Sequence, residues 1–448
     1  MNVETKKSNW LIIWTIVPIL LIGIYIFNHS ILPLQEFPDW QFQGWLWNQI
    51  VFHNTDFGGY YTLHSYIPPN STFTVLIGLL NLGFSPFTAG KIAIFLSCSV
   101  LFIGILFFSR VHLRRKLTPD KVSTIAASSI AFLFVFNFNL FFGQIHFLLG
   151  LGIALLGAYL FHEKNWGSKP IRMMLVFFIC YSTHFMAFTQ LVLYVIITTI
   201  VEKKYENIRP IMIALFPTAL IFVHYLITRS ISGVDATMSI SQVLKEKVMV
   251  FPRIIAPFVR LKGIVGNSEL ALKILNFAIS GFWMWSVMWV LFTHIKRKQA
   301  AVLDWMLLIT FLIAVILPPV SLGMFAPGER FVMFGAIAGI LLFLVEFPKF
   351  RFFTVSCLVV LSSLNYIWSF YQTTKFEQKV ASQLVISNTD NTGLVDPFMR
   401  MVYYKALQEQ KTIPIFTTGL FSFSDSIKPD IYFNSGQIKV NESDSLHR

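Results

Sequence analysis

Charged residues are scarce in this chain of 448 residues. They make up 13% of it, against roughly 25% in a typical soluble domain. Hydrophobic residues make up 55%, and the mean hydropathy is +0.65. Because a single soluble core stops growing near ~250–300 residues, so much apolar surface could not be kept away from water. The composition therefore excludes a water-soluble enzyme, a disordered chain and a repeat array, and it predicts a chain that lies mostly in lipid.

The chain also has few cysteines, and all of them lie in apolar runs: Cys98, Cys180 and Cys357. The polar segments between these runs therefore cannot form a disulfide framework or a thiolate metal site. The same segments lack zinc-ligand spacing, a P-loop, a dinucleotide fingerprint and a nucleophile elbow, and the external loops expected below lack an Asp-x-Asp metal motif. We expect neither a metal nor a cofactor, and the pattern fits a prokaryotic cell envelope.

Long apolar runs dominate the sequence. A helix needs roughly 20 apolar residues to cross about 30 Å of hydrocarbon, so these runs predict an all-α polytopic membrane protein with about 11 transmembrane helices. A run at 171–201 is too long for one helix and is broken near His184, which predicts a tight hairpin of two short spans. The expected spans are 10–27, 87–109, 123–140, 147–161, 171–183, 186–201, 211–228, 271–293, 301–318, 331–347 and 352–371.

Basic residues cluster between alternate runs. The clusters begin at Lys6, Arg110, Lys164, Lys203, Lys296 and Lys349. With the N-terminus inside, about eleven spans place every cluster on the cytoplasmic face, as the positive-inside rule requires. The net charge of +13 is then explained by basic residues in cytoplasmic loops, and we expect no nucleic-acid partner. The same arrangement predicts a transmembrane domain over 1–371 and a small external C-terminal segment over 372–448, in the cytoplasmic membrane.

Two long loops are expected on the external side, 28–72 and 229–270. The first is rich in aromatic residues, and its segment 40–52 predicts an amphipathic helix lying on the membrane. Asp39 is expected at or just before the start of that helix, where a carboxylate is stabilised and can cap the helix. The candidate catalytic carboxylates of this loop are Asp39, Asp56 and Glu36, and the loop also contains His64.

Further polar residues are expected at the external ends of spans or in the second loop. They are Lys91, Gln144, His146, His184, Arg330, Arg253, Arg260 and Lys262. Ionisable groups at membrane depth are costly unless they are paired or wetted, so they are candidates for substrate binding. Interfacial anchoring of the cations and a structural role for the turn histidines are the alternatives. Their location on one expected face favours a shared site.

These residue types together suit one reaction. A carboxylate can act as general base on an acceptor hydroxyl. Cations at the same depth can hold a lipid phosphate and neutralise it as it leaves. Aromatic surfaces suit both a sugar ring and a lipid tail. The pattern therefore predicts transfer of a sugar from a lipid-phosphate donor at the outer face.

The order of elements also resembles the GT-C glycosyltransferases, and within them the bacterial members that use polyprenol-phosphate sugars. The matching segments are Pro38-Asp39-Trp40, Tyr66-Ile67-Pro68-Pro69-Asn70, the run from Gly143 to Leu149, and Arg330 at the start of a late span. The resemblance covers roughly residues 10–350 and implies a GT-C-like fold. It implies that an acidic residue of the first external loop is the base, for which Asp39 matches best. The adjacent acidic pair of many members is absent.

We therefore predict a membrane glycosyltransferase, of hexosyl or mannosyl type, that uses a polyprenyl-phosphate-linked sugar and a glycan or glycolipid acceptor. Asp39 would be the base, Arg330 with Lys91 would hold phosphate, and the histidines would line the sugar or acceptor site. The expected partners are membrane lipid, the lipid-linked donor, the acceptor and envelope-assembly proteins. The alternatives are a flippase or transporter of lipid-linked oligosaccharide, a polysaccharide polymerase or ligase, and a non-catalytic scaffold subunit. A transporter is disfavoured because no internal inverted repeat is evident.

Overall fold

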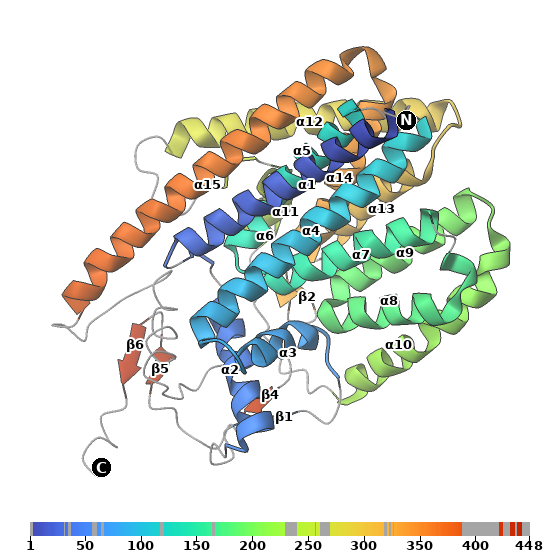
Figure 1. The fold of residues 1–448 in the computed structure, drawn as a ribbon. Coiled ribbons are helices and arrows are strands. Elements are labelled where there is room, and N and C mark those ends of the chain that lie inside the picture. The colour runs from blue at the N-terminus through green and yellow to red at the C-terminus, as the bar shows by residue number, and fades with distance from the viewer. Residues whose placement is uncertain are drawn as a thin grey trace, which may run out of the picture.

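The structure is a computed structural model of the whole chain. It describes residues 3–30, 32–34, 37–55, 61–63, 67–116, 121–163, 166–228, 240–255, 257–259, 269–317, 320–321, 324–325, 327–387, 421–423, 431–434 and 437–440. These residues form a bundle of helices with a few very short strands (Figure 1).

The first half of the chain contributes α1 (Val3–Asn28), α2 (Phe37–His53), α3 (Ser71–Leu80), α4 (Pro86–Lys116), α5 (Lys121–Val135), α6 (Phe138–Phe141), α7 (Ile145–Glu163), η1 (Trp166–Ser168), α8 (Pro170–Thr183), α9 (Phe185–Val201), η2 (Tyr205–Asn207) and α10 (Ile208–Thr228). The second half contributes α11 (Ile240–Ile255), α12 (Glu269–Lys296), α13 (Val302–Ile316), α14 (Pro327–Glu346), η4 (Pro348–Phe350) and α15 (Arg351–Ser387). The strands are β1 (Tyr61–Leu63), β2 (Val320–Ser321), β3 (Met324–Phe325), β4 (Phe421–Phe423), β5 (Ile431–Asn434) and β6 (Gln437–Val440).

Within the described residues, seven helical segments are long and apolar enough to cross a membrane. They are Pro86–Arg114, Lys121–Phe141, Ile145–Glu163, Tyr205–Thr228, Leu270–Lys296, Pro327–Glu346 and Pro348–Gln378. The prediction of a helical integral membrane protein is therefore confirmed. The expected count of about eleven is not, because the runs 10–27, 171–183, 186–201 and 301–318 form shorter apolar helices.

The helices differ in how much of their surface they bury. In α14, 83% of the apolar window is buried, whereas the corresponding share is 17% for the segment that contains α10 and 22% for the one that contains α15. Figure 1 shows α14 and α7 among other helices, while α10 and α15 run along opposite sides of the bundle. An apolar helix that stays outside the core has to face lipid, so α10 and α15 are lipid-facing and α14 is central.

Glycines let the central helices approach closely. A Cβ on Gly104 of α4 would lie 2.4 Å from the backbone O of Gly152 on α7, and a Cβ on Gly152 would lie 2.7 Å from the backbone N of Leu101. Small residues at such crossings allow backbone contact, which replaces hydrophobic exclusion as the main source of helix association in lipid. The α4–α7 contact is therefore fixed by this glycine pair.

Helix α2 differs from the expected surface helix over 40–52. It begins at Phe37, three residues earlier than expected, and Asp39, which was expected at or just before the helix start, lies in its first turn. Gly44 faces Ile77 of α3 at a distance that leaves no room for a Cβ, and Trp40 and Leu46 are buried. Among the side chains of α2 that the structure describes, those at its C-terminal end, from Val51 to His53, are exposed. Packing on α3 therefore turns α2 into a part of the bundle.

The C-terminal segment does not begin at a helix end. Helix α15 continues through residue 371, the expected domain boundary, as far as Ser387. Beyond it, β4 pairs antiparallel with β1, with Tyr61 opposite Phe423, and β5 pairs with β6. The first long loop and the C-terminal segment are thus joined by backbone hydrogen bonds.

Candidate functional site

Arg330, in the first turn of α14, is the centre of a buried polar cluster. Its side chain is 5% exposed. Its Nε donates to Gln144 Oε1 at 3.1 Å, and its Nη1 lies 3.5 Å from Nε2 of His184. Its backbone carbonyl accepts a hydrogen bond from Gln190 Nε2 at 3.0 Å. The starts of α7, α9 and α14 therefore meet at one guanidinium group.

The turn between α6 and α7 positions Gln144. Asn137 caps α6, because its side chain accepts from the backbone N–H of Asn139 at 2.7 Å and of Leu140 at 3.4 Å. Gly143 has a φ of 85°, a conformation that costs a glycine little. Gln144 follows directly, and its backbone N donates to the Asn139 carbonyl at 2.9 Å. The chain is thus reversed within a few residues, and the amide of Gln144 meets Arg330.

His184 is placed by the break between α8 and α9. Its backbone is extended, with φ −164° and ψ 123°, and its Nδ1 accepts from the backbone N–H of Met186 at 3.0 Å. The imidazole therefore caps α9, and the break near residue 184 that the sequence predicts is confirmed. Burial first, and then the nearby Arg330 and His146, hold the pKa of His184 well below its ordinary value, so the ring is neutral at pH 7.

The tautomer of His184 follows from this cap. Because Nδ1 accepts a hydrogen bond, the proton of the neutral ring is on Nε2. That N–H and the Nη1 of Arg330 are 3.5 Å apart, and both are donors. Two N–H groups this close are both satisfied by an acceptor that lies beside them, such as an anionic oxygen.

A chain of ring contacts connects His184 to α2. The rings of His184 and His146 are stacked, with centroids 5.0 Å apart, and the ring of His146 lies 4.2 Å from that of Trp40. The buried Nδ1 of His146 and Nε2 of Gln144 have no hydrogen-bond partner among the described residues. Both point to a group that completes the cluster, because buried polar atoms are rarely left unsatisfied.

Arg253 contacts the start of α14 through an ion pair. Its Nη1 lies 2.8 Å from Oε1 of Glu329, and its guanidinium lies 5.8 Å from the centroid of the Phe138 ring. Glu329 is 1% exposed and immediately precedes Arg330. Among the described side chains here, two guanidinium groups thus accompany one carboxylate, so the region has a net positive charge.

Lys91 lies in a different cluster from the one that was expected. Its Nζ donates to the backbone carbonyl of His29 at 2.6 Å. His29 in turn contacts Glu377 of α15 through Nδ1 at 3.1 Å, and Glu377 also accepts from Ser30. The structure therefore joins Lys91 to α1 and α15, and it records no contact between Lys91 and Arg330 in the described residues.

The structure brings together Gln144, His146, His184 and Arg330 from the set that the sequence predicts, whereas Arg253 contacts Glu329 and Phe138 instead. Asp39 belongs to the same helix turn as Trp40, but its side chain is outside the described residues, as are Glu36, Asp56, His64, Arg260 and Lys262. Sequence analysis missed Gln190 and Glu377. Each is a polar side chain in or beside a long apolar helix. Because burying a polar group in lipid is costly, its position in such a helix is the signal that could have identified it.

The described residues contain no group of three or more His, Cys, Asp or Glu side chains that could hold a metal ion. Comparisons with protein-family models, with curated proteins and with solved structures give no match.

Proposed function

We propose that the protein is a GT-C-type glycosyltransferase that moves a sugar from a polyprenyl-phosphate donor to a glycan or glycolipid acceptor, at the outer face of a prokaryotic cytoplasmic membrane. The observation that carries the proposal is the group of hydrogen-bond donors around Arg330 at the start of α14, called the donor cluster below. The Nη1 of Arg330 and the Nε2 proton of His184 face each other at 3.5 Å, beside the unsatisfied amide nitrogen of Gln144.

The cluster suits a phosphate that acts as a leaving group. The phosphodiester of the donor lipid becomes a phosphate monoester and gains negative charge when the bond to the sugar breaks, and hydrogen-bond donors already in place stabilise that charge without reorganisation. The buried site strengthens each interaction, because few water molecules compete for the donors. The same N–H groups would bind the phosphate of the sugar-carrying lipid before the reaction and the free lipid phosphate after it.

Asp39 is our proposed base. It follows the start of α2 by two residues and directly precedes Trp40, whose ring contacts His146. The backbone of α2 therefore passes within the same ring-stacked cluster that ends at Arg330. A carboxylate in the first turn of a helix stays ionised, since the helix N-terminus favours negative charge, and an ionised carboxylate can accept a proton from an acceptor hydroxyl.

The polarity of the helices supports an outer-face site. Gln144, His184 and Arg330 lie at the starts of α7, α9 and α14. The basic clusters that begin at Lys203 and Lys349 follow the opposite ends of α9 and α14. If basic clusters mark the cytoplasmic side, the donor cluster is at the external side.

Binding of the lipid phosphate tests this proposal. In detergent, undecaprenyl phosphate should raise the unfolding temperature of the protein, and Arg330→Gln should weaken its apparent affinity at least tenfold. A charge-assisted hydrogen bond is worth about 1.5–3 kcal/mol, which corresponds to that factor or more. Arg209→Gln, at the exposed start of α10, is the matched control and should bind like the parent. Equal affinities in all three proteins would refute the phosphate site.

A further inference from the structure

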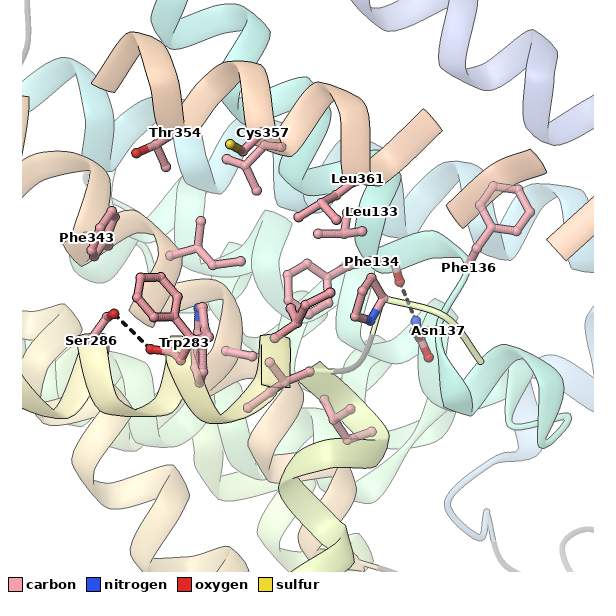
Figure 2. Close-up of a pocket in the computed structure, with 18 residues that line it drawn as sticks. Leu133, Phe134, Phe136, Asn137, Trp283, Ser286, Phe343, Thr354, Cys357 and Leu361 are labelled. Atoms are coloured by element: carbon pink, nitrogen blue, oxygen red, sulfur yellow. Dashed lines mark hydrogen bonds between the residues drawn. The ribbon is translucent and has the colours of Figure 1, made fainter. Parts of the chain in front are cut away.

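A second site, which is apolar, lies on the side of α14 opposite the donor cluster. A cavity of about 190 Å³ is lined by side chains of α5, α11, α12, α14 and α15 (Figure 2). Its walls are almost entirely apolar, and they include Phe134, Ile254, Trp283, Ile340 and Cys357. An apolar cavity of ~150 Å³ is already large enough to bind a small hydrocarbon, so this one has room for a segment of a hydrocarbon chain.

One stripe of α14 connects the cavity to a charged pair. Ala336, Ile340 and Phe343 all line the cavity, and their spacing of four and three residues places them on one face of the helix. Glu329 lies seven residues before Ala336 and therefore belongs to the same stripe. Its partner Arg253 directly precedes Ile254 and Ile255, which also line the cavity. The Arg253–Glu329 pair thus lies above one end of the cavity.

The cavity is separate from the donor cluster. Successive residues of an α-helix are rotated by about 100°, so Glu329 and Arg330 point in different directions. Arg330 contacts Gln144 and His184, from α7 and α9, whereas the cavity is lined by α5, α11, α12 and α15. Helix α14 therefore divides the two sites.

The cavity reaches the lipid-facing surface between α12 and α15. Phe282, one of its lining residues, is 66% exposed, and only 28% and 22% of the apolar windows of α12 and α15 are buried. Its depth also fits a lipid chain. At 1.5 Å per residue, the lining residues of α14 lie from ~10 to ~21 Å beyond Glu329, and one leaflet contributes about half of the ~30 Å hydrocarbon core.

We propose that this cavity binds an acyl chain of an anionic bilayer phospholipid, whose phosphate contacts Arg253. Arg253 is the accessible member of the ion pair, since its side chain is 23% exposed while that of Glu329 is 1% exposed. The bound chain fills a space that would otherwise leave the walls of the cavity without contacts, and so it joins α12 and α15 to α14.

Photo-crosslinking in nanodiscs tests the site with the full chain. The probe is phosphatidylglycerol with a diazirine in its acyl chain, and crosslinked peptides are mapped by mass spectrometry. We expect the main crosslinks on the segments around Phe343 and Cys357. Ala336→Trp, which fills the cavity, should reduce them at least fivefold. Val360→Trp, at a 55% exposed position of α15 outside the cavity, is the matched control and should leave them unchanged.

Two further arms use the unmutated protein, so the test remains decisive if Ala336→Trp does not fold. The corresponding phosphatidylcholine probe, which is zwitterionic, should crosslink less at the same peptides. Undecaprenyl phosphate should not displace the phosphatidylglycerol probe. Crosslinks spread evenly over all lipid-facing helices, equal labelling by both probes, or displacement by undecaprenyl phosphate would each overturn the proposal. None of these outcomes depends on the proposed transferase activity.

Discussion

At the scale of single residues, the donor cluster depends on His184, whose two ring nitrogens make different contacts. His184 caps α9 through Nδ1, and this fixes its proton on Nε2 opposite Arg330. The sequence alone predicts that Gln144, His146, His184 and Arg330 share a site, because each is a polar group at the same end of an apolar run. It could not predict the tautomer of His184, which depends on the hydrogen bond to Met186 and hence on the geometry of the break.

Asp39→Asn tests the proposed base. The amide keeps the size and polarity of the side chain but cannot accept a proton from a hydroxyl, so sugar transfer in proteoliposomes should fall by at least 100-fold, as is typical when general-base catalysis is lost. Expression and the affinity for undecaprenyl phosphate should stay at the parent level. Glycolipid formation by the purified variant at the parent rate would assign the base to another residue.

The low pKa of His184 predicts a pH dependence of stability. The unfolded chain binds a proton at this residue below about pH 6.5, whereas the folded protein does not until a much lower pH. The stabilisation is therefore complete above about pH 6.5 and is lost as the pH falls, at a rate of up to about 1.4 kcal/mol per pH unit. Thermal unfolding in detergent between pH 7.5 and pH 5 measures this loss.

The variant His184→Gln should show a shallower fall than the parent over the same range, since glutamine does not titrate. His53→Gln, at the exposed end of α2, is the control and should follow the parent curve. If the curves of the parent and of His184→Gln have the same slope, protonation of His184 does not limit stability.

At the scale of elements, the hydrophobic pattern of the sequence does not predict which helices pack closely against one another. The apolar runs predict which segments are helical, and the hairpin at 171–201 is confirmed by α8 and α9. They give no information on which faces meet, because the solvent on the outside of the bundle is as apolar as its core. The glycines at residues 104 and 152 carry that information, yet a glycine in an apolar run is also compatible with a lipid-facing position.

Gly152→Ala tests the α4–α7 contact. The new Cβ would lie 2.7 Å from the backbone N of Leu101, so the backbone of one helix has to move, and we expect a loss of about 1–3 kcal/mol of unfolding free energy. Gly281→Ala on α12 is the matched control, since a Cβ there meets no atom within 4 Å. That variant should be unchanged or more stable by about 0.5–1 kcal/mol, because alanine favours the helix. Chemical or thermal unfolding in detergent measures both, and equal stability of the two variants would show that the contact is not tight.

At the scale of the whole molecule, a polar cluster and an apolar cavity lie on either side of one central helix. Arg330 points from α14 toward α7 and α9, while Glu329 and the cavity-lining stripe face α11, α12 and α15. The sequence predicts the helical membrane protein from composition. It could not predict this division, because Glu329 and Arg330 are adjacent in sequence and only the helix rotation separates their environments.

The division predicts that the two sites can be disabled separately. Arg330→Gln should lose undecaprenyl phosphate binding but retain crosslinking of phosphatidylglycerol near Cys357. Ala336→Trp should show the reverse. Binding and crosslinking measured on both variants test this, and a variant that loses both properties while still folded would show that the sites form one continuous groove.

The pairing of β1 with β4 has a consequence for biosynthesis. Residues 61–63 leave the ribosome early, but their partner strand, residues 421–423, is made only after all the described helices. Until then, β1 lacks its partner strand while the later helices are inserted. A nascent chain that stalls before residue 421 would thus have an unpaired β1 strand. Quality-control proteases should therefore distinguish such chains from those in which β1 and β4 are paired.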